Sequence, residues 1–263
     1  YLDMGYIYSR IEPQITPIGI DSLDIHFVIT ENHKVFINNI IVQGNTRTRE
    51  NVIRRQLRVF PGDVYNQERI ARSYREVMML NFFANAAPNI LPVSDDKVDV
   101  EFNVEEKPAG QASANMGYSQ YLGLTGGGGI TLPNFRGRGQ SLSFSFNAGV
   151  SGGGQNSYAY QSYNSDRPKS RSVSISFTDP MVNDTKNLIG GSLYYRMMGG
   201  STMYYSPLET TIAGASIMLG RIFKWPDDFF RGTWQLQIHR REYKGSQADI
   251  DNYAGGRTKS DGI

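Results

Sequence analysis

The chain has 263 residues, enough for one large domain or two ordinary ones, with 27 basic and 25 acidic residues. This near-neutral balance gives no basic field for nucleic acid, so we predict no nucleic-acid partner. Cysteine is absent and only three scattered histidines occur. We therefore predict no disulfide, no metal site and no cofactor. No apolar run reaches the roughly 18 residues of a membrane-spanning helix.

The composition changes near Lys107–Gly110. Five glycines lie in the first 110 residues and 23 in the remaining 153, while acidic residues fall from 15 to 10. We predict a domain boundary at this point, with residues 109–263 forming the second domain. Because the chain begins at Tyr1 and stops at Ile263 without a terminal element, we interpret it as an internal part of a longer protein.

The first half is ordinary α+β sequence. Its β-branched and aromatic runs and its apolar spacing predict strands at 24–29, 36–42, 89–93 and 98–104 and helices at 49–58 and 67–80. Thr48 is the expected cap of the first helix. The order from residue 35 onward is β-α-α-β-β, a small domain in which two helices cover one sheet face. Residues 35–108 are predicted to be one complete unit, and residues 1–34 the C-terminal end of a preceding unit of the same kind.

The second half alternates strictly between apolar and small polar residues. Leu142, Phe144 and Phe146 interleave with serines, as do Val173 and Ile175. The same period of two predicts about seven strands, at 111–119, 122–132, 140–150, 171–178, 189–197, 210–222 and 233–238.

Alternation alone fits both a soluble β-sandwich and a membrane barrel. Short turns at 134–139, 180–187 and 223–232 alternate with longer polar connections at 151–170 and 198–209, which is typical of an antiparallel transmembrane β-barrel. Charged residues are almost absent from the apolar faces. Aromatic residues near strand ends would form interfacial girdles: Tyr194, Tyr195, Tyr204, Tyr205, Trp225, Phe229 and Phe230. We favour the barrel, of which only the first strands are present.

Several motifs together resemble a known family. The Gln43–Asn45 turn, the Phe60–Asp63 break, the Leu80–Phe83 helix end and the strand from Val98 are similar to a polypeptide-transport-associated (POTRA) domain. The Pro133–Gly139 turn and the Phe177–Pro180 segment resemble the first turns of the barrel that follows the last POTRA domain in the BamA family. The family's late Val-Arg-Gly-Phe/Tyr loop motif and its last strand are not in this stretch.

The resemblance implies an outer-membrane protein whose POTRA part is periplasmic and which inserts client β-barrel proteins into the bilayer. Unfolded outer-membrane clients and accessory lipoprotein subunits are the implied partners. Client strands would pair with the edge of the first barrel strand. That strand contributes Ala112, Ser113, Ala114, Asn115, Met116, Gly117 and Tyr118, and the periplasmic turn motif contributes Asn134, Phe135, Gly137 and Gly139.

Two other functions remain open on the sequence: a two-partner-secretion translocator of the same fold, and a soluble β-sandwich binding module. Gly126–Gly129 predicts a pliable strand, or a place where another backbone or a ligand comes close. Arginines on the 49–58 helix suggest either an acidic partner or a solvated face, the second being favoured. We predict no enzyme activity, because no Gly-x-Ser-x-Gly elbow occurs and the paired acidic residues are adjacent in sequence. His239 is expected at a strand end, in the interface.

Overall fold

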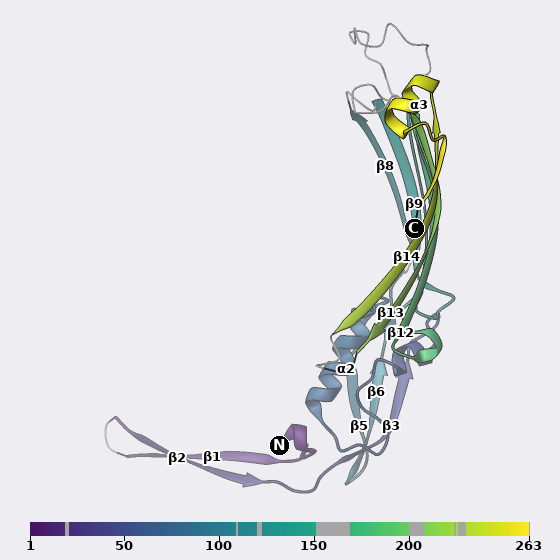
Figure 1. Cartoon of the computed structure of the whole chain (residues 1–263). Helices are drawn as coiled ribbons and strands as arrows, with labels where there is room; N and C mark the ends of the chain where they lie inside the picture. The colour runs from purple at the N-terminus through teal and green to yellow at the C-terminus, as the bar shows by residue number, and fades with distance from the viewer. Residues whose placement is uncertain are drawn as a thin grey trace. The chain divides into compact units, whose positions relative to one another are not determined.

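The computed structural model describes residues 1–18, 21–108, 110–119, 123–150, 169–199, 208–223, 225 and 230–262. The chain forms two compact units, Tyr1–Pro108 and Ala109–Ile263, whose elements are labelled in Figure 1. The predicted long connections fall mostly outside the described residues, as do Tyr204, Tyr205 and Phe229 of the expected girdles. No helix in the described ranges is long and apolar enough to span a membrane.

The first unit is built on a three-stranded sheet with the order β3-β6-β5, in which β3 is parallel and β5 antiparallel to β6. Its strands and helices are β3 (Phe36–Gln43), α1 (Glu50–Arg54), α2 (Gln67–Met79), β4 (Phe83–Asn85), β5 (Pro88–Ser94), β6 (Lys97–Asn103) and β7 (Glu105–Glu106). Val98, Val100 and Phe102 alternate along β6 and are fully buried. They belong to one apolar cluster with Ile53 of α1 and Val77 of α2. The β-α-α-β-β order is thus confirmed.

Helix α1 is shorter than predicted. It spans Glu50–Arg54 and its N-cap is Arg49, whose side chain makes no capping bond. Thr48 is instead 3 % exposed, and its backbone N–H donates to the carboxylate of Glu106 at 2.6 Å. The expected cap is wrong, because the helix begins one residue later than predicted and its N-cap position is held by Arg49. In α2 the cap is Asn66, whose side chain accepts from the N–H of Arg69 at 2.7 Å.

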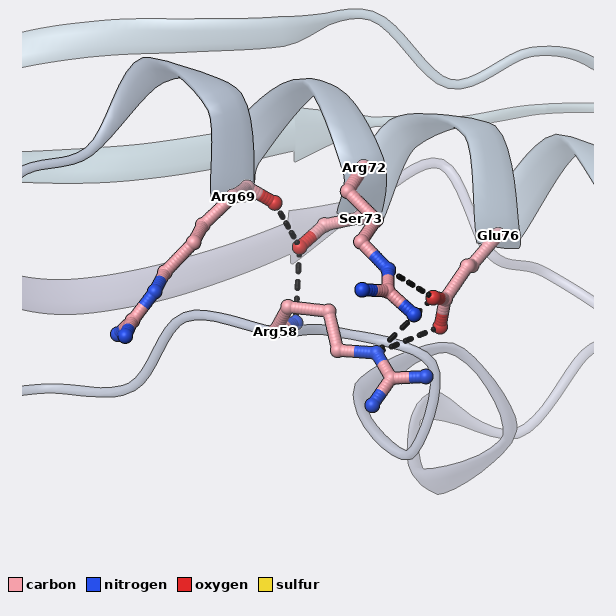
Figure 2. A network of polar contacts seen from close by, with 5 residues as sticks. All are labelled: Arg58, Arg69, Arg72, Ser73 and Glu76. Atoms are coloured by element: carbon pink, nitrogen blue, oxygen red, sulfur yellow. Dashed lines mark hydrogen bonds and ion pairs between the residues drawn. The ribbon is translucent and has the colours of Figure 1, made fainter. Parts of the chain in front are cut away.

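A polar network fastens the segment after α1 to α2 (Figure 2). Nε of Arg58 donates to both carboxylate oxygens of Glu76 at 2.9 Å, and Nε of Arg72 reaches the same carboxylate at 3.0 Å. The buried hydroxyl of Ser73 accepts from the backbone N–H of Arg58 and donates to the carbonyl of Arg69. Arg58 therefore holds the domain together rather than presenting a charge to a partner.

Residues before the sheet form a short helix, η1 (Leu2–Met4), and an antiparallel hairpin of β1 (Arg10–Pro17) and β2 (Leu23–Thr30). Both hairpin faces are exposed, including Ile15 and Phe27. A carboxylate oxygen of Asp3 accepts from the N–H of Glu68 at 2.8 Å, which satisfies one free donor at the start of α2. That residues 1–34 complete a preceding domain stays a prediction.

The second unit is one antiparallel sheet of eight strands that run in sequence order from β8 at one edge to β15 at the other. The strands are β8 (Gln111–Ser119), β9 (Gly123–Phe135), β10 (Gln140–Val150), β11 (Lys169–Asp179), β12 (Asn187–Met198), β13 (Glu209–Ile222), β14 (Arg231–Lys244) and β15 (Lys259–Gly262). A turn of 3-10 helix, η2 (Val182–Asp184), precedes β12, and α3 (Gln247–Ala254) lies between β14 and β15. Strand β14 is more than twice its predicted length, and β15 was not predicted.

The pairing register puts the apolar and polar residues in separate rows. One row across the sheet is almost wholly apolar: Ala112, Ile130, Phe144, Ile175, Leu193, Ala215 and Ile238. The adjacent row is wholly polar: Gln111, Thr131, Ser143, Ser176, Ser192, Ser216 and Gln237. We call the two sides of the sheet the apolar face and the polar face.

Phe144, Phe146, Val173 and Ile175 are 41–48 % exposed on the apolar face. In a sandwich these side chains would pack against a second sheet. No described strand covers them, so these side chains stay open in the part of the chain that the structure describes. On the polar face, serines of neighbouring strands form hydrogen bonds with each other: Ser145 with Ser174 and Ser192 with Ser216, each at 2.7 Å.

Candidate functional site

The predicted pairing residues Ala112–Tyr118 all lie in β8, at the edge of the eight-stranded sheet. This strand pairs along its whole length with β9, and no other described strand pairs with it. Every side chain from Gln111 to Tyr118 is exposed, Met116 and Tyr118 most of all. The second side of β8 therefore presents a row of backbone N–H and C=O groups to whatever lies beside it.

The neighbouring strand β9 holds β8 mostly through its backbone. Ser113, Ala114 and Asn115 pair with Gly129, Gly128 and Gly127 in that order. A glycine contributes no side chain to a cross-strand contact, and such contacts add roughly 0.2–1 kcal/mol per pair. Small side chains and glycines also specify register weakly. The β8–β9 ladder is thus the least side-chain-supported pairing among the long strands of this sheet.

The glycines of β9 have a packing role on its other side. A Cβ placed at Gly128 would come within 3.3 Å of the ring of Phe146, and one at Gly127 would collide with the amide of Asn147. The backbone carbonyl of Ser113 on β8 would also lie 3.0 Å from a Cβ at Gly128, and that of Phe146 2.6 Å from one at Gly127, so glycine lets β9 approach its neighbours closely. This observation supports the close approach predicted for Gly126–Gly129.

The predicted turn motif joins β9 to β10. The side-chain oxygen of Asn134 accepts from the N–H of Gly139 at 2.8 Å, and its carbonyl accepts from Gly137 at 3.0 Å. Arg136, Gly137 and Gly139 all have positive φ, a conformation that glycine adopts without strain. The guanidinium of Arg136 lies 5.4 Å from the ring centroid of Phe135. This turn lies at the same end of the sheet as the start of β8, because Gln111 pairs with Thr131.

The carboxylate of Glu106, shortly before β8 in the chain, joins two segments of the first unit. Glu106 of β7 accepts hydrogen bonds from the Thr46 hydroxyl at 2.8 Å and from the N–H groups of Arg47 and Thr48. Burial raises the pKa of Glu106, but hydrogen bonds from Thr48, Thr46 and Arg47 outweigh it, so the pKa lies below its usual value. The loop after β3 is thereby tied to the last strand of the unit.

The free edge of the first unit's sheet, on β5, is chemically different from the edge on β8. The N–H of Asn103 donates to the carbonyl of Ala87, and Pro88 pairs with Phe102. In an antiparallel ladder the hydrogen-bonding side alternates, so Pro88 and Pro92 turn their backbone away from β6. Proline has no N–H, so this edge offers mainly acceptors.

Two expectations about aromatic and titratable residues are wrong. Tyr194 and Tyr195 are adjacent and take opposite faces: Tyr195 is on the apolar face, and the hydroxyl of Tyr194 accepts from the amide of Gln237 on the polar face. His239 lies within β14 and also lines the polar face beside Tyr194. The period of two, continued past residue 238, places His239 and Arg241 on the polar face, so the sequence held a signal for this position.

The comparisons with known proteins agree with these two folds. Residues 35–107 match the model of the POTRA family, described as surface antigen variable number repeat. The chain is 29 % identical over 197 residues to the outer membrane protein assembly factor BamA of Nitratidesulfovibrio vulgaris, covering 74 % of this chain and 22 % of that protein. It is 28 % identical over 222 residues to BamA of Neisseria meningitidis, covering 82 % and 25 %. The chain thus spans about a quarter of the length of these relatives.

Among solved structures, BamA from Haemophilus ducreyi lacking POTRA domains 1–3 superposes with a TM-score of 0.74 at 21 % identity. The match covers 94 % of this chain and 43 % of that one. These matches define a fold in which a POTRA domain is followed by the strands of an antiparallel barrel sheet. The chain is BamA-like: a POTRA domain at residues 35–107, followed by an antiparallel sheet that matches the BamA barrel.

Proposed function

We propose that the protein assembles outer-membrane proteins, and that client strands pair with the exposed edge of β8 during insertion. The observation that carries the proposal is that β8 is held against β9 by a run of glycines, so that side chains contribute little to this pairing. Relatives that share most of this stretch are named outer membrane protein assembly factors. Binding of accessory lipoproteins to the periplasmic unit stays a prediction.

The mechanism needs no covalent chemistry. An incoming strand that adds to β8 forms hydrogen bonds with the backbone N–H and C=O groups of β8. Leaving such groups without a partner inside a bilayer is costly. Because β8 carries alanine, serine and glycine, a client strand would find few side-chain obstacles to pairing or to sliding by two residues. The weak β8–β9 pairing would let β8 move with the client while β9 stays fixed in the sheet.

Disulfide capture tests this proposal cleanly, since this stretch contains no cysteine. Single cysteines would be placed in the full-length protein at Ala114 and Asn115, with any other cysteine replaced, and one cysteine in the last strand of a client barrel. The matched control is Ser174 of β11, which is paired on both sides. Because Ala114 and Asn115 point to opposite faces, we expect a covalent adduct from the one that shares the face of the client cysteine, and none from Ser174.

The adduct pattern also reports on sliding. If register is loose, one client cysteine should be captured by β8 residues two apart, such as Ala112 and Ala114. Adducts confined to polar-face positions of the inner strands, such as Gln237, would instead favour the translocator alternative. Equal yields at β8 and Ser174, or none at β8 during client assembly, would refute the pairing proposal.

A further inference from the structure

A hollow of about 340 Å³ opens on the polar face between β12, β13 and β14. Its charged and hydrogen-bonding lining consists mainly of Tyr194, Arg196, Gln235, Gln237, His239 and Arg241. Gly214 lies directly beneath the phenol of Tyr194, where any side chain would collide with it. A side chain at Gly214 would therefore displace the Tyr194 ring, which lines the hollow.

The charge on this face is one-sided. Arg196 and Arg241 occupy the same row across β13, both opposite Ile212. The acidic residues in the described strands of the eight-stranded sheet are Asp179, Glu209, Glu242 and Asp261, and the register places all four on the other face. Two of them are already paired there, Glu242 with Lys259 and Asp261 with Arg240. No carboxylate lines the hollow in the described part of the chain.

Arg241 also holds unused hydrogen-bonding capacity. Its Nε is buried and has no partner, and its terminal nitrogens make only long contacts, 3.4 Å to the Tyr243 hydroxyl and 3.5 Å to Nε2 of His239. A guanidinium cannot deprotonate in a protein and presents five donors. A partly buried guanidinium without an anion is unfavourable, and a carboxylate bound beside it would remove that cost.

We propose that this hollow binds carboxylate side chains of an acidic polypeptide segment that occupies the barrel interior. A lipid phosphate would match the charge, but its acyl chains would find no apolar surface here, since the apolar residues face the other side. Amide and hydroxyl groups of Gln235, Gln237 and Tyr194 suit a peptide backbone. The proposal rests on the fold and its register, and stands or falls separately from client pairing at β8.

Photo-cross-linking in the full-length protein tests the site. A benzophenone amino acid would replace Gln237, and the control would replace its neighbour Leu236, which points to the apolar face. Mass spectrometry of the Gln237 adduct should identify a peptide that contains Asp or Glu next to the cross-linked residue. Leu236 should give no such peptide.

A second variant pair tests the charge. Arg196→Gln with Arg241→Gln should lower the cross-link yield from position 237 about tenfold, the change expected from losing charge-assisted contacts. Replacing the acidic residues of the captured segment by lysine should lower the yield equally, and combining that change with Arg196→Glu and Arg241→Glu should restore it. The heat-dependent gel shift of the folded barrel shows which variants fold.

Cross-links from position 237 to lipid alone, to a segment without acidic residues, or with a yield insensitive to both arginines in a folded variant, would each overturn the proposal. Loss of β8 adducts in the disulfide experiment would leave it untouched.

Discussion

The two units use the same alternating strand pattern, but only the first covers the apolar side of its strands within the described residues. On β6 of the POTRA domain Val98, Val100 and Phe102 are completely buried, because two helices cover that face. On the barrel sheet the equivalent apolar residues remain open, with Leu193 at 60 % and Trp234 at 63 % exposure. Alternation thus specifies which residues share a face, while the partner of that face, helix or lipid, is decided by the rest of the chain.

The largest loss of stability should come from removing a side chain from the buried core of the POTRA domain. Phe102→Ala removes a fully buried ring from the POTRA core and should destabilise that domain by about 3–5 kcal/mol. Phe60→Ala in the same unit is the control, because Phe60 is 58 % exposed, and surface changes usually stay within about 0.5 kcal/mol. Urea unfolding of the periplasmic domain in the full-length protein measures both. Similar losses for the two variants would contradict the covered core.

A charged substitution tests the exposed apolar face of the eight-stranded sheet. Ile175→Arg puts a guanidinium on the apolar face of β11 and should cost about 2–4 kcal/mol if that residue lies near the bilayer midplane. Ser176→Arg places the same side chain on the polar face and should cost much less. The fraction folded into liposomes across a urea series compares them. If Ser176→Arg were the worse variant, the assignment of the two faces would be reversed.

These two faces were read correctly from sequence because the period of two is local. What the sequence did not predict depended on distant partners. Thr48 was expected to cap α1, but the N-cap is Arg49. The backbone N–H of Thr48 is bound instead by Glu106, which no local pattern connects to it. Strand β14 was expected to stop at residue 238, but it continues to Lys244 because β13 pairs with it throughout. The ion pair of Arg240 with Asp261 joins that extension to β15.

The edge strand illustrates the same division. The extent of β8 and the small side chains along it were predicted directly. That β9 supports it mainly with glycine, and that those glycines are required by Phe146 and Asn147 of β10, follows only from the three-strand register. The proline-containing edge on β5 was within reach of the sequence, but which way each proline faces depends on the pairing of Ala87 with Asn103.

A smaller loss of stability should follow from changing the carboxylate of Glu106 in the POTRA domain. Glu106→Gln keeps the shape but weakens hydrogen bonds that are assisted by its charge, and should destabilise the domain by about 1–3 kcal/mol. The folded-state pKa of Glu106 is lowered, so its contribution is present above the unfolded pKa and is lost as pH falls through the folded value. Urea midpoints across an acidic pH series measure this.

The control for that series is Glu105→Gln, whose side chain is exposed on the same short strand. The wild type and this control should lose stability in parallel as the pH falls, whereas Glu106→Gln should lose less of it. A Glu106→Gln variant with the same pH dependence as the wild type would show that the hydrogen bonds from residues 46–48 are not what stabilises the ionised carboxylate.

The smallest change in stability is expected from a pair of substitutions that compares the free edge on β5 with the free edge on β8. Pro88→Ala with Pro92→Ala restores two outward N–H groups on β5 and should change domain stability by less than about 1 kcal/mol, since neither proline interrupts the ladder to β6. It should, however, make that edge able to accept an added strand. Cysteine capture at Leu91 with an unfolded client should therefore be weak in the wild-type background and stronger in the double variant. If capture is already strong with both prolines present, then donor groups on the edge are not what limits strand addition, and the difference between β5 and β8 must come from the bilayer rather than from the backbone.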